Sequence, residues 1–148
     1  MHSDIEQTIM QYYPQRSLVS PLDNDDIRWD YDPEHKSLKE LLEDLKTIDP
    51  DVRPGTRGDY VISEEIVVLD GLRLQVCYLG PYAAVNYGFD RDFSEKERDA
   101  LKDVKAALAK HGFTLLENDD LTEQVPWIQH GTETMATVWN CLFAHHND

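Results

Sequence analysis

The stretch DYVISEEIVVLDGLRLQVCYLGPYAAVNYG, residues 59–88, decides the fold because it predicts three consecutive antiparallel strands. Asp70-Gly71 separates two aliphatic runs, and this dipeptide tolerates the positive φ angles that a two-residue hairpin turn requires. Gly80-Pro81 marks a second turn before the third run of apolar residues. The sequence therefore predicts a β-meander over residues 60–88.

The position of the first turn also predicts the register of its two strands. Counting outward from the turn pairs Leu69 with Leu72 and Val67 with Leu74, which places aliphatic side chains on one face. The opposite face is expected to be less apolar, since it carries Arg73, Gln75 and Cys77.

Three helices are expected around this meander, at residues 3–13, 37–48 and about 95–111. Each begins with a serine three residues before a glutamate, the capping-box pattern that satisfies orphan amides at a helix start. The three pairs are Ser3 with Glu6, Ser37 with Glu40, and Ser94 with Glu97. Apolar residues at helical spacing follow each pair, and Gly112 is placed to end the third helix in a left-handed conformation.

Two further strands are expected after the third helix. GFTLLEND, residues 112–119, predicts one, and MATVWNCLFAH, residues 135–145, predicts the other, in an interior position because both of its faces are apolar. The whole chain, residues 1–148, then forms a single α+β domain with a largely antiparallel sheet and about three helices. Residues 14–36 are the one long connection without a predicted element.

The net charge of −15, from 14 basic and 29 acidic residues, limits the choice of partners. A negative field repels nucleic acid and anionic lipid and speeds encounters with basic proteins. No apolar run approaches the roughly 20 residues of a membrane span. The N-terminal residues have neither a basic leader nor an apolar run, so we expect a cytoplasmic protein.

Two acidic clusters are the candidate partner-binding residues. The first is DNDDIRWDYDPEH, residues 23–35, in which two large aromatic side chains offer contact area among carboxylates. Its candidates are Asp23, Asp25, Asp26, Trp29, Asp30, Tyr31, Asp32 and Glu34. The second is ENDDLTE, whose candidates are Glu117, Asp119, Asp120 and Glu123. Asp120 with Glu123 also resembles a helix cap, and Trp127 would border the shared surface if the clusters lie on one face.

The sequence offers little support for metal, phosphate or nucleophile chemistry, and we predict no catalytic residue, metal or cofactor. A calcium loop starting at Asp23 would have Arg28 where the chain must turn, which argues against it. The histidines lack zinc-ligand spacing, and the glycines form no phosphate loop. RPGTRG, residues 53–58, is interpreted as a turn and not as an anion-binding site. Cys77 and Cys141 are expected to be buried free thiols in strands.

Two functions of different classes remain. The first is an acidic, non-enzymatic protein-binding module, an immunity or antitoxin-type inhibitor whose carboxylates occupy the phosphate positions of a basic partner. The alternative is a small hydrolase-like enzyme that joins a carboxylate to a histidine such as His130 or His145 in a cleft. Direct nucleic-acid and membrane binding are not expected, and the sequence leaves a homo-oligomer open.

Overall fold

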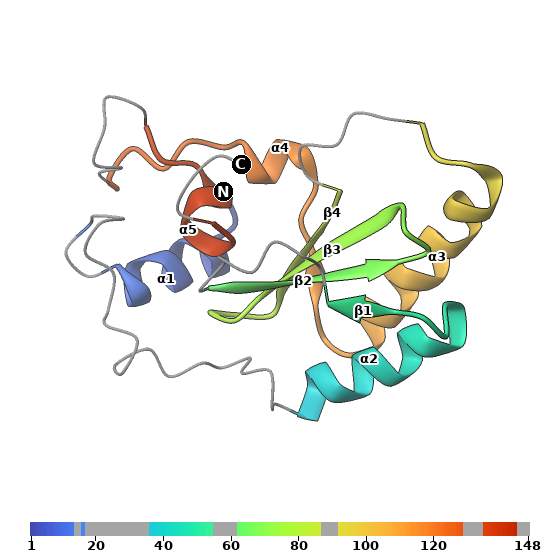
Figure 1. Cartoon of the computed structure of the whole chain (residues 1–148). Coiled ribbons are helices and arrows are strands. Elements are labelled where there is room, and N and C mark those ends of the chain that lie inside the picture. Colours follow the sequence, from blue (N-terminus) through green and yellow to red (C-terminus); the bar gives the residue numbers. More distant parts are fainter. Residues whose placement is uncertain (14–15, 17–35, 55–61, 87–91, 129–134, 145–148) are drawn as a thin grey trace.

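The computed structural model describes residues 1–13, 16, 36–54, 62–86, 92–128 and 135–144 (Figure 1). In this part of the chain the α+β class is confirmed. Five strands form one sheet in the order β1-β2-β3-β4-β5. They are β1 (Arg53–Pro54), β2 (Ser63–Val68), β3 (Leu72–Cys77), β4 (Tyr82–Val85) and β5 (Thr114–Leu115). The first four pair antiparallel, and β5 is parallel to β4.

The meander is confirmed, but the predicted hairpin register is wrong by one residue. Val68 pairs with Leu72, so the connection is the three-residue loop 69–71 and not a two-residue turn. The positive φ angles fall on Leu69 and Asp70, at 52° and 58°, and not on the glycine. A one-residue slip would normally exchange the faces of a strand. The slip does exchange the faces of β2, since Val67 now pairs with Arg73 and not with Leu74. Leu72 and Leu74 still meet aliphatic partners, Val68 and Ile66, because β2 carries aliphatic residues on both of its faces.

One face of the sheet is covered by α2 (Lys36–Ile48) and α3 (Glu95–Lys110) (Figure 1). The apolar stripe predicted for each helix is buried against alternate residues of β2, β3 and β4. From the helices these are Leu38, Leu41, Leu45, Ala100, Val104, Ala107 and Leu108; from the strands they are Ile66, Val68, Leu72, Leu74, Val76 and Ala83. Side chains at alternate positions of a strand share one face, which explains this selection.

The other face of the sheet is covered by α1 (Ser3–Tyr12), with α4 (Asn118–Leu121) and α5 (Val138–Leu142) beside it (Figure 1). Ile5, Ile9, Tyr12 and Tyr13 are buried there, as their helical spacing predicted. This face also carries polar side chains of the sheet in buried positions. Arg73 Nη1 donates to Glu65 Oε1 at 3.0 Å, and Ser63 Oγ donates to the carbonyl oxygen of Phe143 at 2.7 Å.

The strand predicted over residues 135–145 is wrong, because the described part of this segment contains the short helix α5. Thr137 is its N-cap residue, and its Oγ1 accepts from the amide of Asn140 at 3.4 Å. All five residues of α5 are buried, and all but Asn140 are apolar. The segment therefore looks apolar on every side, whether its residues are spaced as in a helix or as in a strand. A short apolar run of this kind does not distinguish a buried strand from a buried helix. Cys141 consequently lies in a helix.

Of the three predicted capping boxes only the one at α3 is confirmed. Ser94 Oγ accepts from the amide of Glu97 at 3.2 Å, and Glu97 Oε1 accepts from the amide of Ser94 at 3.0 Å. Ser3 is instead the first helical residue of α1, and Ser37 lies inside α2, which begins one residue earlier. Gly112 has a φ of 84° after α3, as predicted.

The remaining differences are small additions. β1 occupies the start of the segment that the sequence indicated only as a turn, and α4 and α5 add two short helices to the predicted three. β5 confirms the strand predicted after α3, although it is only two residues long. Within the described ranges, every helix is too short or too polar to cross a membrane.

Candidate functional site

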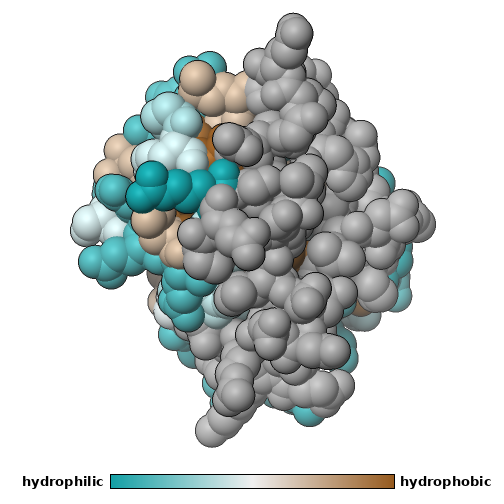
Figure 2. Space-filling model, turned by 90° about the vertical axis from the view of Figure 1, so that its left-hand side faces the viewer, coloured by the Kyte–Doolittle hydropathy of each residue, from teal (hydrophilic) through white to brown (hydrophobic). Residues whose placement is uncertain are grey.

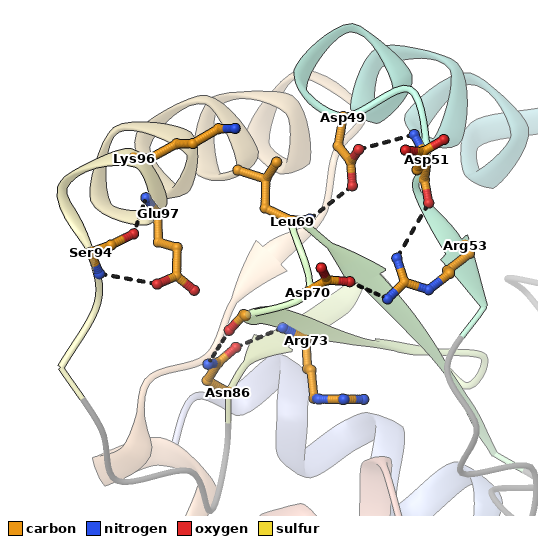
Figure 3. A pocket seen from close by; sticks show the side chains of 11 residues that line it. Asp49, Asp51, Arg53, Leu69, Asp70, Arg73, Asn86, Ser94, Lys96 and Glu97 are labelled. Atoms are coloured by element: carbon orange, nitrogen blue, oxygen red, sulfur yellow. Dashed lines mark hydrogen bonds and ion pairs between the residues drawn. The ribbon is translucent and has the colours of Figure 1, made fainter.

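A polar cleft of about 750 Å³ opens between the end of α2 and the start of α3, above the loop that joins β2 to β3 (Figure 3). One wall comes from the segment that follows α2 and from β1, and the other from the first turn of α3. Its lining residues are Asp49, Asp51, Arg53, Leu69, Asp70, Gly71, Arg73, Asn86, Ser94, Lys96 and Glu97. The volume lies in the range of about 300–1,000 Å³ that is typical of small-molecule sites.

The floor of the cleft is fixed by a buried carboxylate. Asp49 Oδ1 accepts from the amide of Asp51 at 2.9 Å, and Asp49 Oδ2 accepts from the amide of Leu69 at 2.8 Å. The hydrogen bond from Leu69 is the main reason that the pKa of Asp49 lies below its ordinary value. It also holds Leu69 in a left-handed conformation, which a side chain with a Cβ seldom adopts.

A second polar side chain fixes the same loop from the opposite edge. Asn86, itself left-handed with a φ of 52°, accepts from the amide of Arg73 at 2.7 Å through Oδ1. Its Nδ2 donates to the carbonyl oxygen of Gly71 at 2.8 Å. Three of the four non-glycine residues with positive φ in the described chain therefore line this cleft. Such conformations persist where neighbouring groups hold them, and they are common at binding sites.

Most charged side chains of the lining form ion pairs or hydrogen bonds within the protein. Arg53 of β1 forms an ion pair with Asp70 of the loop between β2 and β3. The carboxylate of Glu97 caps α3, and Arg73 pairs with Glu65 at 3.0 Å on the α1 side of the sheet. Neither Arg53 nor Arg73 therefore offers an unpaired charge to the cleft.

The second acidic cluster is built around α4. Asp120 Oδ2 accepts from the amide of Glu117 at 3.1 Å, so the capping pair is Glu117 with Asp120 and not the predicted Asp120 with Glu123. The prediction failed because the helix ends at Leu121, before the residues that Asp120 was expected to cap. Glu117 and Asp119 are exposed, and Asp120 is half-buried.

Glu123 brings α4 together with the start of α1. Its Oε1 lies 2.9 Å from the ammonium nitrogen of Met1. This hydrogen bond, with the nearby charges of Asp120 and Glu6, raises the pKa of the Met1 ammonium. Acidic residues of α1 and of the α4 segment thus surround one cation. We call Glu6, Glu117, Asp119, Asp120 and Glu123 the acidic surface.

Charge is segregated between the two faces of the sheet. The elements on the α1 face, meaning α1 with the described residues 112–128 and 135–144, contain six acidic residues and no lysine or arginine. By contrast, α2 and α3 together contain seven acidic and eight basic residues. In Figure 2, which views the molecule from its α1 end, hydrophilic residues surround small hydrophobic areas in the described part.

The first acidic cluster is not among the residues that the structure describes. Asp23, Asp25, Asp26, Trp29, Asp30, Tyr31, Asp32 and Glu34 all lie outside the described residues. Trp127, which was expected to border a shared surface, is only partly exposed and packs against the core on the α1 face.

The described chain contains a histidine–carboxylate contact, but it joins two helices and is not in the polar cleft. His111 Nε2 lies 2.7 Å from Asp44 Oδ2, and His111 Nδ1 lies 3.7 Å from Glu40 Oε2. Lys110 Nζ adds a contact of 3.1 Å to Asp44. These side chains fasten the end of α3 to the middle of α2. His130 and His145, the histidines of the hydrolase alternative, lie outside the described residues.

The two cysteines are free and buried, as predicted. Burial raises the pKa of each thiol to about 12. Among the described residues, no group of three or more His, Cys, Asp or Glu side chains is arranged to hold a metal ion.

Comparison with known proteins does not add to these observations. No known protein family, curated protein or solved structure matches the chain.

The sequence did not predict the polar cleft. Its residues come from four separate stretches of the sequence, 49–53, 69–73, 86 and 94–97, and no motif joins them. The one available signal was the combination of a turn at 53–58 with the cap of α3, and each of these has a sufficient local explanation.

Proposed function

We propose that the protein is a non-enzymatic binding module that engages a basic partner protein through its acidic surface, in the manner of an immunity or antitoxin-type inhibitor. The observation that carries this proposal is the segregation of charge. The helix α1 with residues 112–128 and 135–144 carries six acidic residues and no lysine or arginine, whereas α2 and α3 are nearly neutral. Arg73, on the α1 side of the sheet, is paired with Glu65. An acidic face of this kind steers a basic protein to one side of the molecule and speeds association.

The contacts of the Met1 ammonium group also support the binding of cationic groups by the acidic surface. Its ammonium group binds Glu123 and lies in the field of Asp120 and Glu6. A lysine or arginine of a partner would meet the same carboxylates, with Glu117 and Asp119 exposed next to them. Each such pair contributes modestly, roughly 0.2–1 kcal/mol when exposed, so recognition requires several. The acids and aromatic residues of 23–34 are proposed as the second part of the contact.

The experiment is quantitative affinity capture at low and moderate salt with four forms of the protein. The first is unaltered, and the second carries Glu117→Gln with Asp119→Asn. The third is the matched control, Asp99→Asn with Asp103→Asn, which removes the same charge from exposed positions of α3. The fourth has the six acids of residues 23–34 neutralised.

We expect the unaltered protein and the α3 control to retain the same basic proteins, and the α4 variant to retain them less well as salt rises. Retention that is equal in all four forms would contradict the proposal. Loss in the fourth form alone would assign recognition to residues 23–34 and exclude the acidic surface.

A further inference from the structure

The polar cleft contains two ionisable side chains that form no hydrogen bond or ion pair within the described residues, although the charge of one of them, Lys96, helps to lower the pKa of Asp49. Asp49 accepts two amides, Asp70 pairs with Arg53, and the carboxylate of Glu97 caps α3. Lys96 and Asp51 remain. Within the described residues, neither side chain makes a hydrogen bond or an ion pair, with the other or with any third group.

These two charges have opposite signs and come from opposite walls. Figure 3 shows Lys96 directed from α3 toward Leu69 and Asp49, with Asp51 across the cleft beside Arg53. Because they form no ion pair with each other, a ligand that contacts both would place a negative charge at Lys96 and a positive charge at Asp51. A molecule with one charge would leave the other side chain unused.

We propose that this cleft binds a small zwitterion, with its carboxylate against the Lys96 ammonium and its ammonium against the Asp51 carboxylate. The proposal is independent of the acidic surface and of any basic partner protein. A ligand without net charge also suits a chain of net charge −15, since an anion would be repelled by the whole molecule.

Two further features of the cleft favour a ligand of this kind. Its floor is held by the hydrogen bonds of Asp49 to Leu69 and of Asn86 to Gly71, so binding requires little ordering of the loop. The remaining charges of the lining are paired, so the polar groups available to the ligand are largely the two unpaired side chains and the exposed backbone.

The test is a titration of the ¹⁵N-labelled protein, followed by amide chemical shifts, with three probes. Diglycine carries both charges, N-acetyldiglycine carries only the carboxylate, and diglycine amide carries only the ammonium. We expect saturable shifts at Leu69, Gly71 and Lys96. Diglycine should bind roughly 1.5- to fivefold more tightly than either probe with one charge, the range expected for one solvent-exposed ion pair.

Variants assign each end of the ligand. Lys96→Gln should weaken the binding of diglycine about 1.5- to fivefold and abolish its advantage over diglycine amide, whereas Asp51→Asn should abolish its advantage over N-acetyldiglycine. Lys102→Gln and Asp99→Asn make the same charge changes at exposed positions of α3 outside the cleft lining and should leave all three affinities unchanged.

Three results would overturn the proposal. The first is the absence of saturable shifts at the cleft up to about 20 mM probe, a concentration that detects a Kd in the millimolar range. The second is equal affinity for all three probes, and the third is an equal effect of the cleft variants and their controls. Unchanged core resonances in each variant confirm that folding is intact.

Discussion

Asp49 and Leu69 are joined by a hydrogen bond of 2.8 Å between a buried carboxylate and the amide of a left-handed residue. This bond connects the end of α2 to the loop between β2 and β3, and so fixes the floor of the polar cleft. It explains why the hairpin register differs from the one that Asp70-Gly71 predicts. A carboxylate held in place outside the hairpin makes a left-handed leucine acceptable.

Replacement of Asp49 by Asn should lower the free energy of unfolding by about 1–2 kcal/mol, because an amide side chain cannot accept from both amides. The pKa of Asp49 is lowered in the folded state, so its carboxylate stabilises the fold above the ordinary value of 3.8. This contribution is lost as pH falls through the acid range. Urea unfolding of both forms between neutral and acid pH measures it, and an unchanged pH dependence in the variant would refute it.

The contact of Asp44 with His111 predicts a second loss of stability in acid. Hydrogen bonds from His111 and then Lys110 lower the pKa of Asp44, so stability is present above the ordinary carboxylate pKa and declines below it. Asp44→Asn should flatten this part of the pH profile of the urea midpoint. Asp103→Asn, at an exposed position of α3, is the control and should leave the profile as it is.

The buried thiols of Cys77 and Cys141 should be inert in the folded protein. With a pKa of about 12, each thiol supplies almost no thiolate near neutrality, and burial blocks the reagent. At about pH 8 we expect both thiols to react with an aromatic disulfide only at the rate of unfolding. Labelling of either cysteine at the rate of a free thiol would show that its position is accessible.

Arg73→Ala should destabilise the protein by about 2–3 kcal/mol, because it removes an ion pair with Glu65, whose side chain is only 2% exposed. The value is below that of a fully buried pair, since 32% of the Arg73 side chain is exposed. Chemical denaturation measures the difference. Lys102→Ala, on the exposed side of α3, should change stability by less than about 0.5 kcal/mol. Similar losses in both variants would contradict a specific role for the pair.

Sequence patterns predicted the elements whose signals are local. The stripes of α2 and α3, the cap at Ser94 and the glycine after α3 each depend on neighbouring residues. Predictions failed where contacts between residues distant in the sequence determine the local structure. The hairpin register depends on Asp49, twenty residues away, and α5 is a helix within a run that is apolar at any period.

The two candidate sites also differ in how far the sequence predicts them. The four acids of residues 117–123 were visible in the sequence because they lie within one short segment, whereas the contact of Glu123 with Met1 joins residues 122 positions apart. The polar cleft could not be predicted, since its unpaired charges become distinctive only after the fold has paired all the others.

The central claim is that the acidic surface recognises a basic protein, and titration calorimetry of a captured partner tests it most directly. Glu117→Lys with Asp119→Lys should weaken the Kd about tenfold or more at low salt, with a smaller effect at high salt. The same reversals at Asp99 and Asp103 of α3 should change the Kd by less than about twofold. Equal effects at both positions, or a Kd that does not respond to salt, would contradict the claim.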